Sequence, residues 1–306
     1  MNALYKDLDE RFLKLDKRRT NYRFDLEIDI PWSRSAESGC HYPDDLLARF
    51  GFPIQLLAPE TRVTFDWAIA VSMCELFAEF ERQAIDFARN NERAIGQRPS
   101  VVALCDEEQK HIALFHRYAS LLRRCEPTPG AAERLSAPLD RMLGRFAEHY
   151  AVSAKLDGAA AHYLFWAHLI FFEEMTIYLD EALRDAPDIQ PLWRAIHSAH
   201  RREETQHVIT DVAFLAALDL GAADRLELST RFVLGVLIRE YWGFACLTPA
   251  AELVGTTHSH QRELLPECGV TKRPFFEDIL SSKLFRRTRA AIPYLGQLAQ
   301  ERNLSG

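Results

Sequence analysis

The segment Ala195–Asp211, AIHSAHRREETQHVITD, carries three candidate metal ligands on one helical stripe. His200, Glu204 and His207 stand at positions i, i+4 and i+7, so an α-helix places their side chains on one face. Two imidazoles and one carboxylate amount to half of a metal site. A second Glu-x-x-His, running from Glu108 to His111, lies 96 residues earlier. We expect it to supply the other half.

The composition predicts a globular chain with a large core, since 48% of the 306 residues are hydrophobic and 26% are charged. The net charge of −7 gives no basic surface for nucleic acid or an anionic membrane, so neither is an expected partner. The six cysteines include no C-x-x-C and are predicted to be free thiols in the cytoplasm. The charged N-terminus is unlike a signal peptide, and no apolar run is long enough to cross a membrane.

The hydrophobic pattern is helical from residue 59 onward. It predicts four long helices, with Ser100 capping the second and a connecting helix between the second and third. These helices span about 59–90, 101–124, 158–184 and 189–218, with the connector at 131–152. Weaker patterns predict helices at 1–17, 43–50, 224–246, 275–286 and 287–302. No run of alternating strands is found.

The expected fold is therefore all-α, with two helical hairpins joined by a long crossover. This is the ferritin-like form of a four-helix bundle. We predict one domain over 1–306: a metal-binding core at about 59–218, an N-terminal extension at 1–58 and C-terminal helices at 222–303.

A dinuclear carboxylate site in such a bundle also needs one glutamate from each of the two remaining helices. The third long helix offers Glu173 and Glu174 inside the apolar stretch LFWAHLIFFEEMTIYL. A buried carboxylate without a partner is costly, so a charge in these surroundings is expected to have a partner. The alternative is that one of the two glutamates faces solvent and the other pairs with an arginine. Glu173 shares a stripe with Trp166 and Ile177 and is preferred over Glu174.

The first long helix offers three glutamates. Glu75 precedes Glu108 by 33 residues, close to the 31 that separate Glu173 from Glu204. This match favours Glu75 over Glu81, which lies on a different apolar stripe. Glu79, 29 residues before Glu108, fits equally well and stays open. The prediction is Glu75.

These ligand types suit iron or manganese, and no cysteine accompanies them. His200 is an additional imidazole that either binds the metal or serves as an outer hydrogen-bond donor. Asp211, one turn after His207, is the expected acceptor for the His207 ring N–H. Glu107 and Glu203 point about 100° away from their ligand neighbours and are interpreted as structural.

Glu75, Glu108-x-x-His111, Glu173 and His200-x-x-x-Glu204-x-x-His207 resemble the di-iron N-oxygenases of the p-aminobenzoate N-oxygenase family. That family has a ferritin-like bundle and an extra histidine ligand one turn before the last glutamate, which His200 matches. The resemblance covers residues 59–218.

The resemblance implies two iron ions, O2 as co-substrate and an external reductase or other electron donor. It implies oxidation of an amine nitrogen to hydroxylamine, nitroso or nitro in secondary-metabolite biosynthesis. The substrate would be an aryl amine or amino acid, free or tethered to a carrier protein. A homodimer is an open alternative to a monomer. The rival functions are a di-iron C–H hydroxylase or desaturase, a ferroxidase or iron-storage bundle, and a purely structural helical protein.

Overall fold

The computed structural model describes residues 23–50, 54, 57–95, 98–154, 158–237, 247–255 and 274–305, and in these residues the chain is all-helical. The only β-type pairing there is an isolated bridge between Cys40 and Ile189. The helices before the connector are η2 (Trp32–Ala36), α2 (Asp44–Arg49), α3 (Pro59–Asn90), α4 (Glu92–Ile95) and α5 (Pro99–Arg124). They are followed by α6 (Ala131–Ala154), α7 (Ala159–Arg184), α8 (Pro191–Ala217), α9 (Ala222–Phe232) and the π-helical turn η4 (Val233–Leu237). The last are α10 (Leu247–Leu253), α12 (Pro274–Ser281), η6 (Lys283–Phe285), α13 (Arg286–Ala291) and α14 (Pro293–Ser305).

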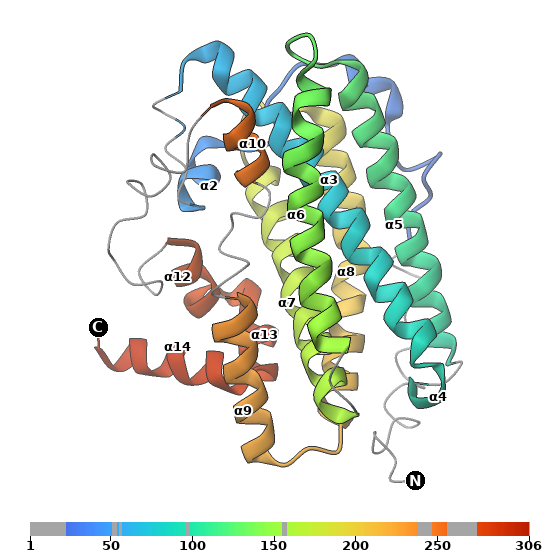
Figure 1. Ribbon diagram of the computed structural model, residues 1–306, viewed down its shortest axis with the longest axis vertical. Coiled ribbons are helices and arrows are strands. Elements are labelled where there is room, and N and C mark those ends of the chain that lie inside the picture. Colours follow the sequence, from blue (N-terminus) through green and yellow to red (C-terminus); the bar gives the residue numbers. More distant parts are fainter. Residues whose placement is uncertain are drawn as a thin grey trace.

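Four long helices form the body of the molecule (Figure 1). α3 packs along α5, and α7 packs along α8, with the two helices of each pair running in opposite directions (Figure 1). α6 runs the length of the body and returns the chain to the end from which α7 starts (Figure 1). The predicted long helices and the connecting helix are thereby confirmed.

Aromatic side chains hold the two helix pairs together. Phe80 of α3 stacks on Phe172 of α7, with ring centroids 3.7 Å apart. Within the α7–α8 pair, Trp166 stacks on Phe214, with ring centroids 4.4 Å apart. α7 is buried on nearly every face, which explains why its sequence is apolar almost all round. Its position places Glu173 in the interior rather than at the surface.

The C-terminal helices cover α7 from outside. α13 packs on α7 and α8, and its first backbone amides point at the buried carboxylate of Glu174. The N–H groups of Arg287 and Thr288 donate to Glu174 at 3.2 and 2.9 Å. A carboxylate here satisfies amides that have no partner inside the helix. The adjacent glutamates of α7 therefore face different neighbours, with Glu174 anchoring α13.

Replacing Glu174 by alanine should lower the free energy of unfolding by about 2 kcal/mol, because a charged capping acceptor is lost at a buried helix start. Glu148→Ala, at an exposed position of α6, is the control and should change stability by less than about 0.5 kcal/mol. Urea denaturation followed by circular dichroism measures both. Equal losses would show that the contact between Glu174 and α13 contributes nothing.

Three sequence predictions differ from the structure. Ser100 does not cap α5, which starts at Pro99, two residues before the expected start, with Arg98 at the cap position. Proline suits the first helical position because its missing N–H would have no partner there. In the described part of the helix expected over 224–246, α9 ends at Phe232 and passes into η4, while 238–246 lie outside the described residues. The two expected C-terminal helices are four shorter ones. The predicted helix over 1–17 lies outside the described residues.

No helix in the described ranges is both long enough and apolar enough to cross a membrane. Within these ranges Cys40, Cys74, Cys105 and Cys125 are free thiols.

Candidate metal centre

The two Glu-x-x-His motifs face each other between α5 and α8, with all four side chains buried. His111 Nδ1 lies 3.2 Å from Glu204 Oε1, and His207 Nδ1 lies 3.3 Å from Glu108 Oε1. Each imidazole therefore approaches the carboxylate of the opposite motif. The two motifs therefore form two similar half-sites, one on α5 and one on α8, which face each other.

Three further side chains complete the cluster. His200 Nε2 lies 2.8 Å from Glu204 Oε1 and 3.4 Å from Glu81 Oε1. Glu173 Oε1 lies 3.9 Å from His207 Nδ1. Two sets of ligand atoms could each hold a metal ion, because within each set all the atoms lie within 4.8 Å of one another. They are Glu81, His111, His200 and Glu204 in one set, and Glu108, Glu204 and His207 in the other.

The structure corrects the prediction for the first long helix. Glu75 points away from the cluster and pairs with Arg123 at 2.6 Å. Glu79 pairs with Arg82 at 2.6 Å, also away from the other ligands. The carboxylate that α3 contributes is Glu81, which is 2% exposed.

The ring nitrogens that face away from the cluster are bound by the glutamates that precede the two motifs. Glu203 lies 2.8 Å from His111 Nε2, and Glu107 lies 2.9 Å from His207 Nε2. Each motif thus orients the imidazole of the other across the helix pair. The structural interpretation of Glu107 and Glu203 was incomplete, because they fix the rotamers and tautomers of the candidate ligands. The repeated Glu-Glu-x-x-His pattern was the signal available in the sequence.

The sequence predicted that Asp211 accepts a hydrogen bond from the His207 ring. This prediction is wrong, because Glu107 occupies that position. Asp211 is fully buried and faces Glu173. Burial is the main cause that raises the pKa of Asp211, to about 7.

The N-terminal extension covers one side of the centre. Arg23 pairs with Glu107 at 3.1 Å, and the Phe24 backbone N–H donates to Glu203 at the same distance. The Phe24 ring is parallel to that of His111, 5.9 Å away. Lys110 pairs with Glu203 and also donates to the Phe24 carbonyl. Both outer carboxylates are therefore neutralised by cations on this side.

Burial and mutual repulsion dominate the electrostatics of the cluster. Burial raises the pKa of Glu81 and of Glu173 well above the ordinary value, and neighbouring carboxylates add to the effect. Burial would lower the pKa of His111, but its hydrogen bonds to Glu108 and Glu203 raise it to about 9. The two histidines beside Glu204 outweigh its burial and hold its pKa well below the usual range. So many buried charges call for a cation to compensate them.

Several buried ligand atoms make no hydrogen bond in the described residues. They are Glu108 Oε1, both Glu173 oxygens, Glu204 Oε1, both His200 nitrogens and His207 Nδ1. His200 Nε2 lies 2.8 Å from Glu204 Oε1 without the geometry of a hydrogen bond, so the two atoms do not point at each other. Buried polar atoms that lie close together without forming hydrogen bonds need an explanation, and a metal ion that binds them jointly provides one. The residues fit a dinuclear metal centre.

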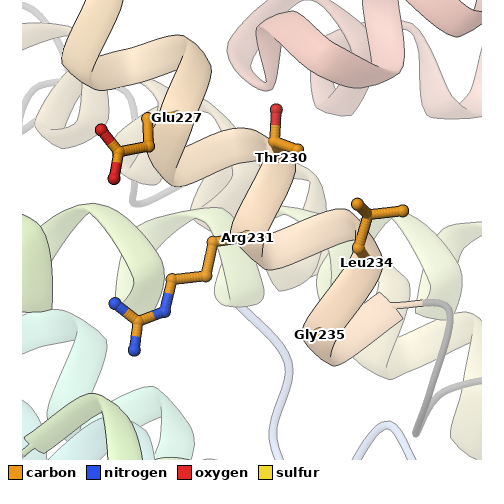
Figure 2. Close-up of a pocket in the computed structure, with 5 residues that line it drawn as sticks. All are labelled: Glu227, Thr230, Arg231, Leu234 and Gly235. Carbon is orange, nitrogen blue, oxygen red and sulfur yellow. The ribbon is translucent and has the colours of Figure 1, made fainter.

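A surface depression elsewhere on the molecule takes no part in this site. It is lined by Glu227, Thr230, Arg231, Leu234 and Gly235, which follow one another along α9 and η4 (Figure 2). None of the candidate ligands lines it.

Comparisons of the chain with family models, with curated proteins and with solved structures found no match. The function is therefore inferred from the geometry of the cluster and from the resemblance of its motifs.

Proposed function

We propose that the protein is a ferritin-like di-iron N-oxygenase, which uses O2 to oxidise an amine nitrogen of a small molecule. The observation that carries this proposal is the position of His200 beside Glu81 and Glu204. A symmetric carboxylate bundle needs only two histidines. A third imidazole in the ligand set is the feature that the resembling N-oxygenases have and generic di-iron bundles lack.

The proposed ligand set balances the charge of two divalent ions. Glu81, Glu108, Glu173 and Glu204 supply four negative charges when ionised, and His111, His200 and His207 supply neutral nitrogen. Oxygen and imidazole ligands without cysteine suit iron, with manganese as the alternative. The iron would supply the reaction with O2. The chain would hold both ions and exclude water from the cluster.

The helix arrangement supports the ferritin-like part of the proposal. Two antiparallel pairs are joined by a long connection that returns the chain along the body (Figure 1). Such a connection distinguishes ferritin-like bundles from simple up-and-down bundles.

The remaining parts of the proposal concern partners. Because no Gly-rich dinucleotide motif is found in the sequence, we propose that electrons come from an external reductase in the cytoplasm. The substrate would be an aryl amine or amino acid, free or on a carrier protein, in secondary-metabolite biosynthesis.

Product analysis tests the activity. Iron-loaded, reduced protein is incubated with O2 and a panel of aryl amines and amino acids, and the products are separated by mass spectrometry. We expect hydroxylamine, nitroso or nitro compounds from at least one amine. Products hydroxylated only at carbon would favour a C–H hydroxylase. Iron oxidation without any organic product would favour a ferroxidase.

Substitution of His200 by alanine should leave the helical content unchanged and lower iron affinity by about 10- to 100-fold. His116→Ala, which removes a mostly exposed imidazole on α5, is the matched control and should bind iron like the parent. Unchanged affinity and activity in His200→Ala would remove the main reason for choosing an N-oxygenase over other di-iron proteins.

A further inference from the structure

A buried tyrosine is linked to a histidine and an aspartate at one end of the metal cluster. The Tyr118 hydroxyl of α5 lies 3.0 Å from His41 Nε2 and, less closely, 3.4 Å from Gln190 Oε1, and His41 Nδ1 lies 2.7 Å from Asp66 Oδ2. Asp66 also accepts from the backbone N–H groups of His41 and Tyr42. None of these residues was predicted from the sequence to have a functional role.

A series of aromatic rings connects this tyrosine to the cluster. Tyr118 stacks on Trp193 of α8, with ring centroids 5.2 Å apart. Trp193 contacts His197 at 4.3 Å, and Phe115 contacts both His197 and His200, at 6.5 and 4.9 Å. His200 is one of the proposed metal ligands. The rings therefore form a continuous path from Tyr118 to the metal centre.

The helix register explains why the path exists. Tyr118 follows His111 by seven residues on α5, and Trp193 precedes His200 by seven on α8. Because the two helices run in opposite directions, both residues lie two turns beyond the cluster at the same end, about 10 Å from the ligands.

Two polar groups on this path have no hydrogen bond that would account for their burial. Both ring nitrogens of His197 and Nε1 of Trp193 are buried without a hydrogen-bond partner among the described residues. Burial lowers the pKa of His197 well below its usual value, so its ring is neutral. A neutral imidazole leaves no fixed positive charge between Tyr118 and the cluster.

We propose that Tyr118 is a redox-active residue that passes single electrons between an external donor and the metal centre, with His41 as its proton acceptor. The proposal rests on the proposed function, since the electron acceptor is an O2-oxidised metal ion in the cluster. In the forward step, Tyr118 loses one electron toward the cluster and its phenolic proton to His41 Nε2. The products are a neutral phenoxyl radical and an imidazolium paired with Asp66. An external one-electron donor then reduces the radical, and the proton returns from His41.

The triad is suited to couple the two transfers. Burial raises the pKa of Tyr118, so the phenol does not ionise before the electron leaves. Loss of the electron without the proton would leave a buried cation, which is costly. His41 removes this cost because its Nε2 lies against the phenol and takes the proton, while its other nitrogen donates to Asp66. His41 and Asp66 are 10% and 14% exposed at their side chains, close to the surface where a donor could dock.

The test begins with metal-free protein and a photochemical oxidant, oxidised tris(bipyridine)ruthenium generated by a laser flash. Transient absorption and electron paramagnetic resonance then follow the phenoxyl radical. We expect a long-lived radical that is lost in Tyr118→Phe and retained in Tyr178→Phe. Tyr178 is a matched control, because it is a buried tyrosine that hydrogen-bonds Asp278 rather than a histidine. His41→Gln should slow radical formation roughly 100-fold.

A second arm measures the connection to the metal. After iron loading and exposure to O2, an external one-electron donor should reduce the oxidised iron more slowly in Tyr118→Phe than in Tyr178→Phe. Equal rates, or a long-lived radical that survives in Tyr118→Phe, would overturn the inference. If the chain bound no iron, the proposed function would fail, while the metal-free arm would still decide whether Tyr118 is redox-active. Circular dichroism verifies that each variant is folded.

Discussion

Replacing Glu81 by alanine is expected to remove one of two bound iron ions, whereas replacing Glu75 by alanine leaves both in place. Glu81 lies 3.4 Å from His200 Nε2 and belongs to the first set of ligand atoms. Glu75, on the same helix, pairs with Arg123 instead. Loss of an anionic ligand from a buried site should reduce iron content to about one ion per chain.

The two variants form a matched pair, since each removes one carboxylate from α3. Metal analysis after gel filtration measures iron per chain, and Mössbauer spectroscopy distinguishes paired from isolated ions. The reverse result, with iron lost in Glu75→Ala and kept in Glu81→Ala, would show that the sequence-based choice was correct and that the buried cluster is not the metal site.

The metal-free protein is expected to lose stability as the pH rises from about 7.5 to about 9. His111 has a folded-state pKa of about 9, against an unfolded value near 6.5. Its contribution to stability is therefore fully present below pH 6.5 and is lost as the pH passes through 9. His207 shifts in the same direction. The combined loss should be of the order of a few kcal/mol.

The carboxyl groups with raised pKa reinforce this trend. Asp211, with a folded-state pKa of about 7, and Glu81 and Glu173 bind protons more tightly in the folded state, so their stabilisation also disappears as the pH rises. Glu204 shifts the opposite way, and its contribution is already complete above its unfolded pKa near 4.5. It stays constant over this window.

Bound iron should reverse the trend, because metal ions replace the protons on the ligands. The stabilisation that iron gives should grow with pH. Burial lowers the pKa of His162, His197 and His200, so these side chains add stability as the pH rises through about 6.5. Melting temperatures measured above that step, from about pH 7.5 to 9, with and without ferrous ion under anaerobic conditions, test both statements. A melting temperature of the metal-free protein that rises over this range would contradict the electrostatics described for the cluster.

The sequence was sufficient to predict the long helices and most of the cluster. Helical periodicity identified α3, α6, α7 and α8 almost to the residue, because their apolar faces are continuous. The spacing within the two Glu-x-x-His motifs is local, so a helix alone brings Glu108 to His111 and Glu204 to His207. The burial of Glu173 was predicted because a carboxylate inside so apolar a helix is expected to have a partner.

The contacts that depend on how helices rotate against each other were harder to predict. Glu75 was chosen because its distance from Glu108 matched the other hairpin, but the register of α3 against α5 differs from that of α7 against α8. The carboxylates bound by the Nε2 atoms of His111 and His207 come from the opposite helix, so no spacing within one helix reveals these contacts. The Tyr118–His41–Asp66 triad joins three distant segments, and its members had no pattern that distinguished them in the sequence.

Anaerobic titration of metal-free protein with ferrous ion tests the central claim most directly. Metal analysis of the protein recovered at each point gives the stoichiometry, and Mössbauer spectra after exposure to O2 show whether the ions are coupled. We predict saturation at about two iron ions per chain and a coupled diferric centre, as the two ligand sets sharing Glu204 require. Saturation at one ion, or no tight binding of iron, would contradict the dinuclear centre and the function proposed from it.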